Sequence, residues 1–220
     1  MTDTTTAPRR PGRPPAEDGP STRERLLDRA RELFALHGYA GVTLRKLAEV
    51  AKVNPALIHY YFGDKESLYE HAVGATVEPL LESVEAELDA PVDGAPAIGR
   101  VIRQHMRLIA ANPWLPPLIM REVLLEEGRL RARFIKAFAG RGAGLLQQLI
   151  EREQAEGRFR KDLDPQLATL SLLAQTVFPF LAYPMTSQVF GVTRDAAFIE
   201  RYATHLERLF VQGARAGGRP

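Results

Sequence analysis

The chain has 220 residues, of which 45% are hydrophobic and 25% charged, a composition typical of a globular protein with one large domain or two small ones. It contains no cysteine, which excludes disulfides, thiolate nucleophiles and cysteine-ligated zinc or iron–sulfur centres. The net charge is only +2, so any affinity for nucleic acid must come from local clusters of basic residues. The first twenty residues lack the apolar core of a signal peptide, which together with the missing cysteines predicts a cytoplasmic protein.

Residues 1–20 are rich in proline, threonine and arginine and have no hydrophobic periodicity, so a disordered basic arm is expected. Two interpretations of this arm stay open. The segment Arg10–Pro15 is similar to the Gly-Arg-Pro core of AT hooks, in which Arg13 would enter a narrow minor groove. The alternative is a tail that only increases solubility.

Capping signals place three helices in the next segment. Ser21 and Glu24 have capping-box spacing, and the helix they begin should stop at Gly38. Thr43 caps a short second helix, and Asn54 followed by Pro55 starts a third that ends before Gly63. Two short helices braced by a longer one predict a helix-turn-helix.

The rest of the chain is expected to be helical throughout. Asp64 caps a long helix that runs to about Leu88 and bends near Pro79. Turn residues then separate the segments 97–111, 113–125, 129–156, 165–182, 184–190 and 195–214. Residues 165–193 carry no charge, yet their prolines and glutamines favour a buried helix over a membrane span. The predicted fold is all-α, with no membrane partner.

The charge distribution agrees with a DNA-binding role for the turn motif. Between residues 43 and 63 the chain has Arg45, Lys46 and Lys52 against the single acid Glu49. The second helix of such a motif lies in the major groove, and free amides at both helix starts can bind phosphate.

The run TLRKLAEVAKVNPALIHYYFGDKESL, from Thr43 to Leu68, resembles the DNA-binding domain of the tetracycline-repressor (TetR) family. The resemblance covers residues 21–70. It implies a DNA-reading domain at 21–66 and a helical domain at 67–220 that binds a small-molecule effector and dimerises. A homodimeric repressor of a palindromic operator on double-stranded DNA, released by that effector, is the function implied.

The resemblance also assigns residues to the DNA. Lys65 and Thr43 would bind phosphate, and Arg45 and Lys46 lie on the same positive surface. Base edges and phosphates would be contacted by the recognition helix through Asn54, Pro55, Ala56, Leu57, His59 and Tyr60. Tyr61 and Phe62 are expected to pack in the core beneath that helix.

Three departures from the family pattern affect how the helix-turn-helix is expected to contact DNA. Lys52 replaces the usual turn glycine, so a non-glycine residue at positive φ is expected, at a cost of roughly 1 kcal/mol. His59 replaces a frequent tyrosine and can still donate to phosphate. Ala56 and Leu57 replace glycine and threonine, which favours apolar contact with thymine methyl groups.

The second domain supplies the candidate effector site. Its predicted pocket residues are His105, Trp114, Met120, Arg121, Glu122, Phe138, Gln175 and Phe178. For Arg121 and Glu122 a structural ion pair is the alternative. The predicted dimer contacts are Leu172, Phe180, Tyr202, Leu206 and Leu209, unless this stripe faces only its own core.

No catalytic residues, metal site or cofactor are predicted. The five histidines lack metal-binding spacing, and Gly140–Gly144 follows no strand and lacks the Gly-Lys-Ser/Thr of a phosphate loop. Two rival interpretations remain: a DNA-binding regulator without a small ligand, and an all-α enzyme that uses the apolar pocket.

Overall fold

The computed structural model describes residues 21–91, 96–125, 128 and 130–215, and within these ranges the chain is helical except for turns and one isolated bridge between Phe159 and Arg215. The first helices are α1 (Thr22–Gly41), α2 (Leu44–Ala51), α3 (Pro55–Phe62) and the long α4 (Lys65–Asp89). They are followed by α5 (Ile98–Ala111), α6 (Leu115–Ile119), α7 (Arg131–Phe134), α8 (Gly140–Ala155), α9 (Pro165–Leu181), α10 (Tyr183–Phe190) and α11 (Ala196–Ala214). Two π-helical segments, η1 (Met120–Leu124) and η2 (Ile135–Ala139), extend α6 and join α7 to α8. The all-α prediction is confirmed.

Side-chain caps begin the helices where the sequence predicted them. The Ser21 hydroxyl accepts the Glu24 N–H at 3.2 Å, and the Glu24 carboxylate accepts the Ser21 N–H at 2.7 Å. Thr43 Oγ1 accepts the Lys46 N–H at 3.1 Å. Asn54 Oδ1 accepts the Ala56 N–H at 2.9 Å. Each bond satisfies an amide that the helix itself leaves free, so local chemistry determines where these helices start.

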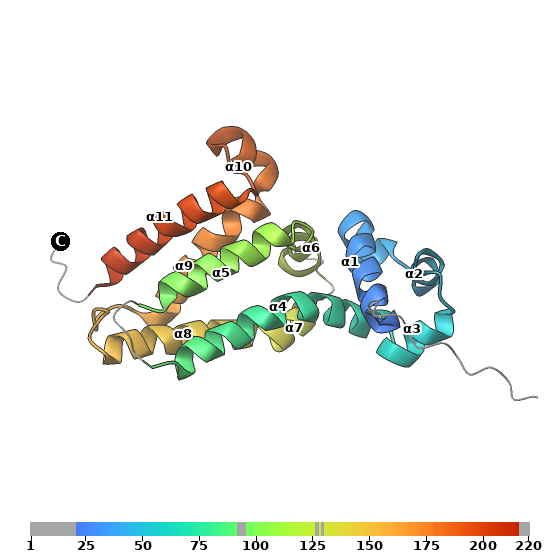
Figure 1. Ribbon diagram of the computed structural model, residues 1–220, viewed down its shortest axis with the longest axis horizontal. Coiled ribbons are helices and arrows are strands. Elements are labelled where there is room, and N and C mark those ends of the chain that lie inside the picture. The colour runs from blue at the N-terminus through green and yellow to red at the C-terminus, as the bar shows by residue number, and fades with distance from the viewer. Residues whose placement is uncertain (1–20, 92–95, 126–127, 129, 216–220) are drawn as a thin grey trace, which may run out of the picture.

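The molecule is elongated, with α1, α2 and α3 at one end and the C-terminal end of α11 at the other (Figure 1). Helix α4 starts in the first group and runs along the rest of the molecule, where it packs against α8 and α5. Helix α11 lies across α5, and α9 packs against both α5 and α8. Because α4 belongs to both halves, it fixes the orientation of the small N-terminal unit relative to the rest.

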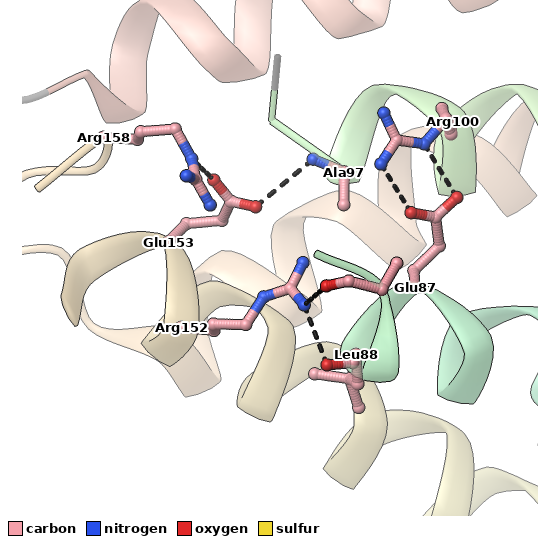
Figure 2. Close-up of polar contacts among 8 residues, drawn as sticks. Glu87, Leu88, Ala97, Arg100, Arg152, Glu153 and Arg158 are labelled. Carbon is pink, nitrogen blue, oxygen red and sulfur yellow. Dashed lines mark hydrogen bonds and ion pairs between the residues drawn. The ribbon is translucent and has the colours of Figure 1, made fainter. Parts of the chain in front are cut away.

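A polar cluster joins the far ends of α4, α5 and α8 (Figure 2). The Glu153 carboxylate is fully buried, pairs with the Arg158 guanidinium and accepts the Ala97 N–H at 3.2 Å. Arg152 donates to the carbonyl of Leu88 at 2.8 Å. A buried carboxylate with both an ion partner and an N–H donor is satisfied, so this cluster is a structural clamp.

A second pair strengthens the same end. The Arg100 guanidinium donates to both carboxylate oxygens of Glu87, at 2.8 and 2.6 Å (Figure 2). This bidentate bond lowers the pKa of Glu87 below its usual value, with the charge of Arg100 as a further cause. It ties α4 directly to α5, two helices that contribute to the cavity described below.

Within the described ranges no single helix has the length and apolar character needed to cross a bilayer. Only α9 and α10 taken together reach that composition, and their axes are bent by 86°. Buried residues along α9, among them Leu172 and Phe180, pack into the protein core.

Candidate nucleic-acid interface and ligand cavity

Helix α3 has one buried side and one exposed side. Ile58 and Phe62 are buried and anchor the helix to the N-terminal core, as expected for Phe62, while Tyr61 is partly buried. The exposed residues are those that the sequence assigned to DNA: Asn54, Pro55, Ala56, Leu57, His59 and Tyr60. Tyr60 is 80% exposed. The helix therefore presents a continuous surface from its first residue to its last turn.

Helix α2 adds a second exposed set beside α3. Thr43, Arg45 and Lys46 are all exposed, and the Lys46 ammonium lies 3.5 Å from the Glu49 carboxylate. The Thr43 hydroxyl accepts the Lys46 N–H as the cap of α2, and the helix itself supplies no acceptor for the amides of Leu44 and Arg45. Positive side chains and a helix N-terminus thus lie on the same surface.

The turn between α2 and α3 has the strained geometry that the sequence predicted. Lys52 has φ 53° and ψ 45°, in the left-handed region. Its N–H bonds to the carbonyl of Glu49 at 3.2 Å, and the Val53 N–H bonds to that of Ala48 at 3.0 Å. The small, buried Ala48 lets the two helices come close at this turn.

Two of the predicted phosphate donors have intramolecular partners. Nδ1 of His59 lies 2.6 Å from the carbonyl oxygen of Gly63. Because a carbonyl only accepts, Nδ1 carries a proton, and Nε2 faces outward as an acceptor when neutral and as a donor when protonated. The Lys65 ammonium lies 4.2 Å from the centre of the Tyr39 ring. Arg13 and the rest of the proposed basic arm lie outside the described residues.

A buried carboxylate connects the N-terminal unit to the larger domain. Glu122, in η1, accepts the Tyr39 N–H at 3.0 Å and the Nε–H of Arg121 at 3.1 Å. Arg121 also donates to the carbonyl of Phe34 at 3.4 Å. Gly38 has φ 70°, and a β-carbon there would overlap the Arg121 guanidinium. The positive φ favours glycine at this position, and the missing side chain leaves room for the Arg121 guanidinium.

Aromatic rings surround this junction. Phe34, Tyr39 and Tyr69 pack within 6.1 Å of one another, measured between ring centres. Burial raises the pKa of Tyr69, and the negative charge of Glu122 raises it further. The rings and the carboxylate therefore hold the end of α1, the start of α4 and η1 as a single packed unit.

The larger domain contains a cavity of about 510 Å³. This volume lies within the range of small-molecule sites, roughly 300–1,000 Å³. Its walls come from α4, α5, α6, η1, α7, η2, α8 and α9. The lining side chains are Val77, Leu80, Leu81, Val84, Val101, His105, Leu108, Ile109, Leu115, Pro116, Ile119, Leu124, Phe134, Phe138, Ala139, Gly142, Ala143, Leu146, Leu173, Ala174, Val177, Phe178 and Leu181.

Three of the eight residues predicted to line a pocket do so: His105, Phe138 and Phe178. The other five, Trp114, Met120, Arg121, Glu122 and Gln175, lie outside the lining. Arg121 and Glu122 form the junction described above, which agrees with the alternative of a structural ion pair.

Local contacts explain two of the other displaced residues. The Trp114 indole N–H donates to the side chain of Asn112 at 3.2 Å, so its ring is held at the start of α6. The backbone carbonyl of Gln175 accepts from the Tyr202 hydroxyl at 3.1 Å, and the Gln175 side-chain oxygen is buried without a partner among the described residues. Aromatic or polar character alone therefore does not place a residue at a cavity.

Sequence reasoning missed most of the walls. On α4, Val77, Leu81 and Val84 follow helical spacing and line the cavity. On α8, Gly142 and Ala143 line it, and a β-carbon at Gly142 would lie 3.2 Å from Leu81 Cδ2, so the glycine lets α4 and α8 pack closely. A stripe of apolar residues on α4 opposite small residues on α8 was the signal in the sequence that could have located the site.

His105 is held by a hydrogen bond at one wall of the cavity. Its Nδ1 lies 3.2 Å from the Thr176 hydroxyl on α9. Burial lowers the pKa of His105 to about 4, because the charged imidazolium would lose its hydration. The ring is therefore neutral at pH 7.

The predicted dimer contacts divide into buried and outward-facing residues. Leu172, Phe180 and Leu206 are buried in their own chain, so their assignment to a dimer surface was wrong. Tyr202 is partly buried and bonds to Gln175, whereas Leu209 is exposed. The exposed residues of α9 instead include Leu167, Leu170, Ala174 and Phe178, of which Ala174 and Phe178 also line the cavity.

Comparisons with known proteins agree with this architecture. Residues 26–72 match the model of bacterial regulatory proteins of the tetR family, and residues 95–211 match the tetracyclin repressor-like C-terminal domain. The HTH-type transcriptional repressor NicS of Pseudomonas putida is 27% identical over 154 residues, covering 67% of this chain and 70% of NicS. The HTH-type transcriptional regulator RutR of Escherichia coli is 26% identical over 200 residues, covering 86% of this chain and 89% of RutR.

A solved structure shows the same fold. The transcriptional regulator FadR from Bacillus subtilis, in complex with stearoyl-CoA, superposes with a TM-score of 0.71 at 19% identity, covering 87% of this chain and 99% of FadR. With both family models matched in chain order and the recognition helix exposed, this chain is a DNA-binding transcriptional regulator of the TetR family.

Proposed function

We propose that the protein is a homodimeric repressor that binds a palindromic operator and is released from it by an apolar small molecule. The observation that carries the DNA part is the surface of α3, where Asn54 to Leu57, His59 and Tyr60 are exposed while Ile58 and Phe62 anchor the helix. A twofold dimer would place two such helices about 34–36 Å apart, one turn of B-DNA.

Capture of bound genomic DNA followed by binding measurements on the recovered fragment tests this role. Replacing Arg45 with alanine should weaken binding to all sequences and reduce the salt slope by about 0.9 per protomer, because one phosphate contact is lost. Replacing Leu57 should instead change the preferred operator, because this side chain faces bases. The matched control is Lys161→Ala, which removes one exposed positive charge far from α3.

The proposed release from DNA depends on the contacts that join the cavity to the N-terminal unit with its helix-turn-helix. Ile119, just before η1, and Leu124, its last residue, line the cavity, while Glu122 between them bonds to Tyr39 at the end of α1. A ligand that displaces η1 therefore moves the group that holds α1. Helix α4, which lines the cavity on both sides of Pro79, provides a second route. Coupling of this kind requires that the ligand prefer the dimer whose recognition helices have the wrong separation for DNA.

Glu122→Gln tests the link without removing the acceptor. The amide oxygen can still accept the Tyr39 N–H, but the ion pair with Arg121 is lost. We expect DNA and ligand each to bind nearly as in the wild type, while the ligand reduces DNA affinity by a smaller factor. If the ligand reduces the DNA affinity of wild type and variant by the same factor, Glu122 has no part in the release mechanism.

For the dimer, the exposed side of α9 is the proposed contact. Leu170 is 64% exposed and lies between Leu167 and Ala174 on one side of the helix. Leu170→Glu should give a monomer in sedimentation equilibrium and lower operator affinity, because a charge would be buried at the twofold axis. Leu36→Glu, at a leucine on α1 that is 74% exposed, should leave the mass unchanged.

The cavity also distinguishes between the rival functions. A regulator without a small ligand would be expected to have a filled domain, and about 510 Å³ of apolar space argues against it. Catalysis would need a nucleophile or paired acid and base groups, and the lining within the described residues offers one neutral imidazole as its polar side chain.

A further inference from the structure

The cavity has almost no polar surface of its own. Among the side chains that line it within the described residues, His105 is the only one with a polar group. Arg141, next to Gly142 in α8, is already engaged: its guanidinium pairs with Glu78 and, at 2.9 Å, with Glu85. A bound molecule therefore meets apolar walls and one imidazole.

The hydrogen bonds around His105 determine which nitrogen carries the proton. The Thr176 hydroxyl has a single proton and lies 2.9 Å from the carbonyl of Leu172 and 3.2 Å from that of Leu173. The shorter of these contacts is to Leu172, so the single hydroxyl proton is donated to that carbonyl and the hydroxyl oxygen accepts from Nδ1–H of His105, 3.2 Å away. Thr176 is fully buried, so water does not compete for these bonds.

The other edge of the ring then has a defined role. With the proton on Nδ1, the Nε2 atom carries a lone pair, and it lies on the ring edge opposite Thr176. Because burial lowers the pKa of His105 to about 4, this atom stays unprotonated at neutral pH. Among the described residues, the lining therefore supplies one hydrogen-bond acceptor of fixed orientation and no charged side chain.

We infer that the effector is an uncharged, largely apolar molecule with one hydrogen-bond donor, such as a hydroxyl group, which bonds to Nε2 of His105. This inference rests on the proposed function only in taking the cavity as the effector site. A carboxylate placed against His105 would lose its hydration with no cation among the described lining residues, and it would also face the lone pair of Nε2. A molecule whose polar atom only accepts, such as an ether, would leave Nε2 unpaired.

The test compares three probes with the same dodecyl chain: 1-dodecanol, dodecyl methyl ether and dodecanoate at pH 8. Binding to the full-length protein is measured by calorimetry below the aggregation limit of each probe, and by the rise in melting temperature. The alcohol should bind about tenfold more tightly than the ether, because one hydrogen bond contributes about this factor to affinity. Dodecanoate should bind most weakly. Tighter binding of the ether or of dodecanoate than of the alcohol would overturn the inference.

Two variants assign the preference to His105. His105→Phe keeps a flat ring but removes the acceptor. The affinity for the alcohol should therefore fall about tenfold, while the affinity for the ether stays unchanged. Thr176→Val keeps the side-chain shape and removes the group that orients the ring. The ratio of the alcohol affinity to the ether affinity should therefore decrease. If His105→Phe does not fold, Thr176→Val alone decides, and an unchanged alcohol-to-ether ratio in it contradicts the inference.

These measurements use no DNA, so they are independent of the regulatory role. Failure of 1-dodecanol to release the operator, while it binds with the expected preference, would count against effector-controlled repression only. Equal binding of all three probes by a protein that does bind DNA would count against the ligand class only.

Discussion

The recognition helix and the cavity are built in opposite ways. Helix α3 is defined within a few residues of chain, by the Asn54 cap, Pro55 and Gly63, and two anchors, Ile58 and Phe62, fix its exposed side. The cavity is a space between helices that are far apart in sequence, from Val77 on α4 to Leu181 on α9. A recognition surface can therefore be inferred from local sequence, whereas a cavity depends on how whole helices pack.

The largest expected difference between the two regions lies in their packing. Ile58→Ala should lower the free energy of unfolding by about 3 kcal/mol, because the side chain is fully buried and leaves a void. Ile119→Ala should cost only about 1 kcal/mol, because that isoleucine already borders the cavity and loses fewer contacts. Urea unfolding of both variants measures the difference, and equal losses would mean that the cavity is filled in solution.

A second difference depends on pH and belongs to the cavity alone. His105 binds a proton near pH 6.5 when unfolded but only near pH 4 when folded. Protons therefore stabilise the unfolded chain, and stability falls as the pH drops through this range. Between pH 7.5 and pH 5 the wild type should lose about 2 kcal/mol more than His105→Phe in urea unfolding. If the two curves are parallel, the imidazole is not buried in the neutral form.

A third prediction compares two left-handed helix ends. Lys52 ends α2 at φ 53°, and Gly191 ends α10 at φ 63°. Lys52→Gly should raise the free energy of unfolding by up to about 1 kcal/mol, and Gly191→Ala should lower it by a similar amount. Space does not confound the second change, because a β-carbon at Gly191 would meet no atom within 4 Å. A destabilised Lys52→Gly would indicate that the lysine side chain makes a contact that outweighs the strain.

The smallest effect on stability is expected on the recognition surface itself. Tyr60→Ala should change the free energy of unfolding by less than about 0.5 kcal/mol, since the ring is 80% exposed. Its effect on operator affinity should nevertheless be clear. A variant that unfolds more easily and binds DNA normally would reverse the assignment of this residue.

The sequence predicted helices well wherever a cap or a turn residue marked their ends. The expected segments 97–111 and 165–182 correspond to α5, Ile98–Ala111, and α9, Pro165–Leu181. The expected helix 129–156 instead includes the π-helical turn η2, and 113–125 ends in η1. No local signal marks a π-helical turn, because it results from the packing of the helix against its neighbours.

For the functional residues, the success of a prediction depended on how far apart in the sequence the interacting groups lie. The exposed set on α3 followed from a motif of consecutive residues, as did the positive φ at Lys52. The assignments of Glu122 and Leu172 failed because a carboxylate or a leucine can serve a cavity, a junction or a core equally well. The role of Glu122 follows from its bond to Tyr39, a residue 83 positions away in the sequence.

The amino-acid sequence by itself determined the helical elements, the helix-turn-helix and the surface it offers to DNA, because caps, glycines and anchoring residues act over one or two turns. The tertiary structure decided which apolar residues face a cavity, a neighbouring helix or solvent. An apolar stripe specifies that one side of a helix is buried, but only the packing of α4, α5, α8 and α9 determines whether atoms or empty space lie opposite.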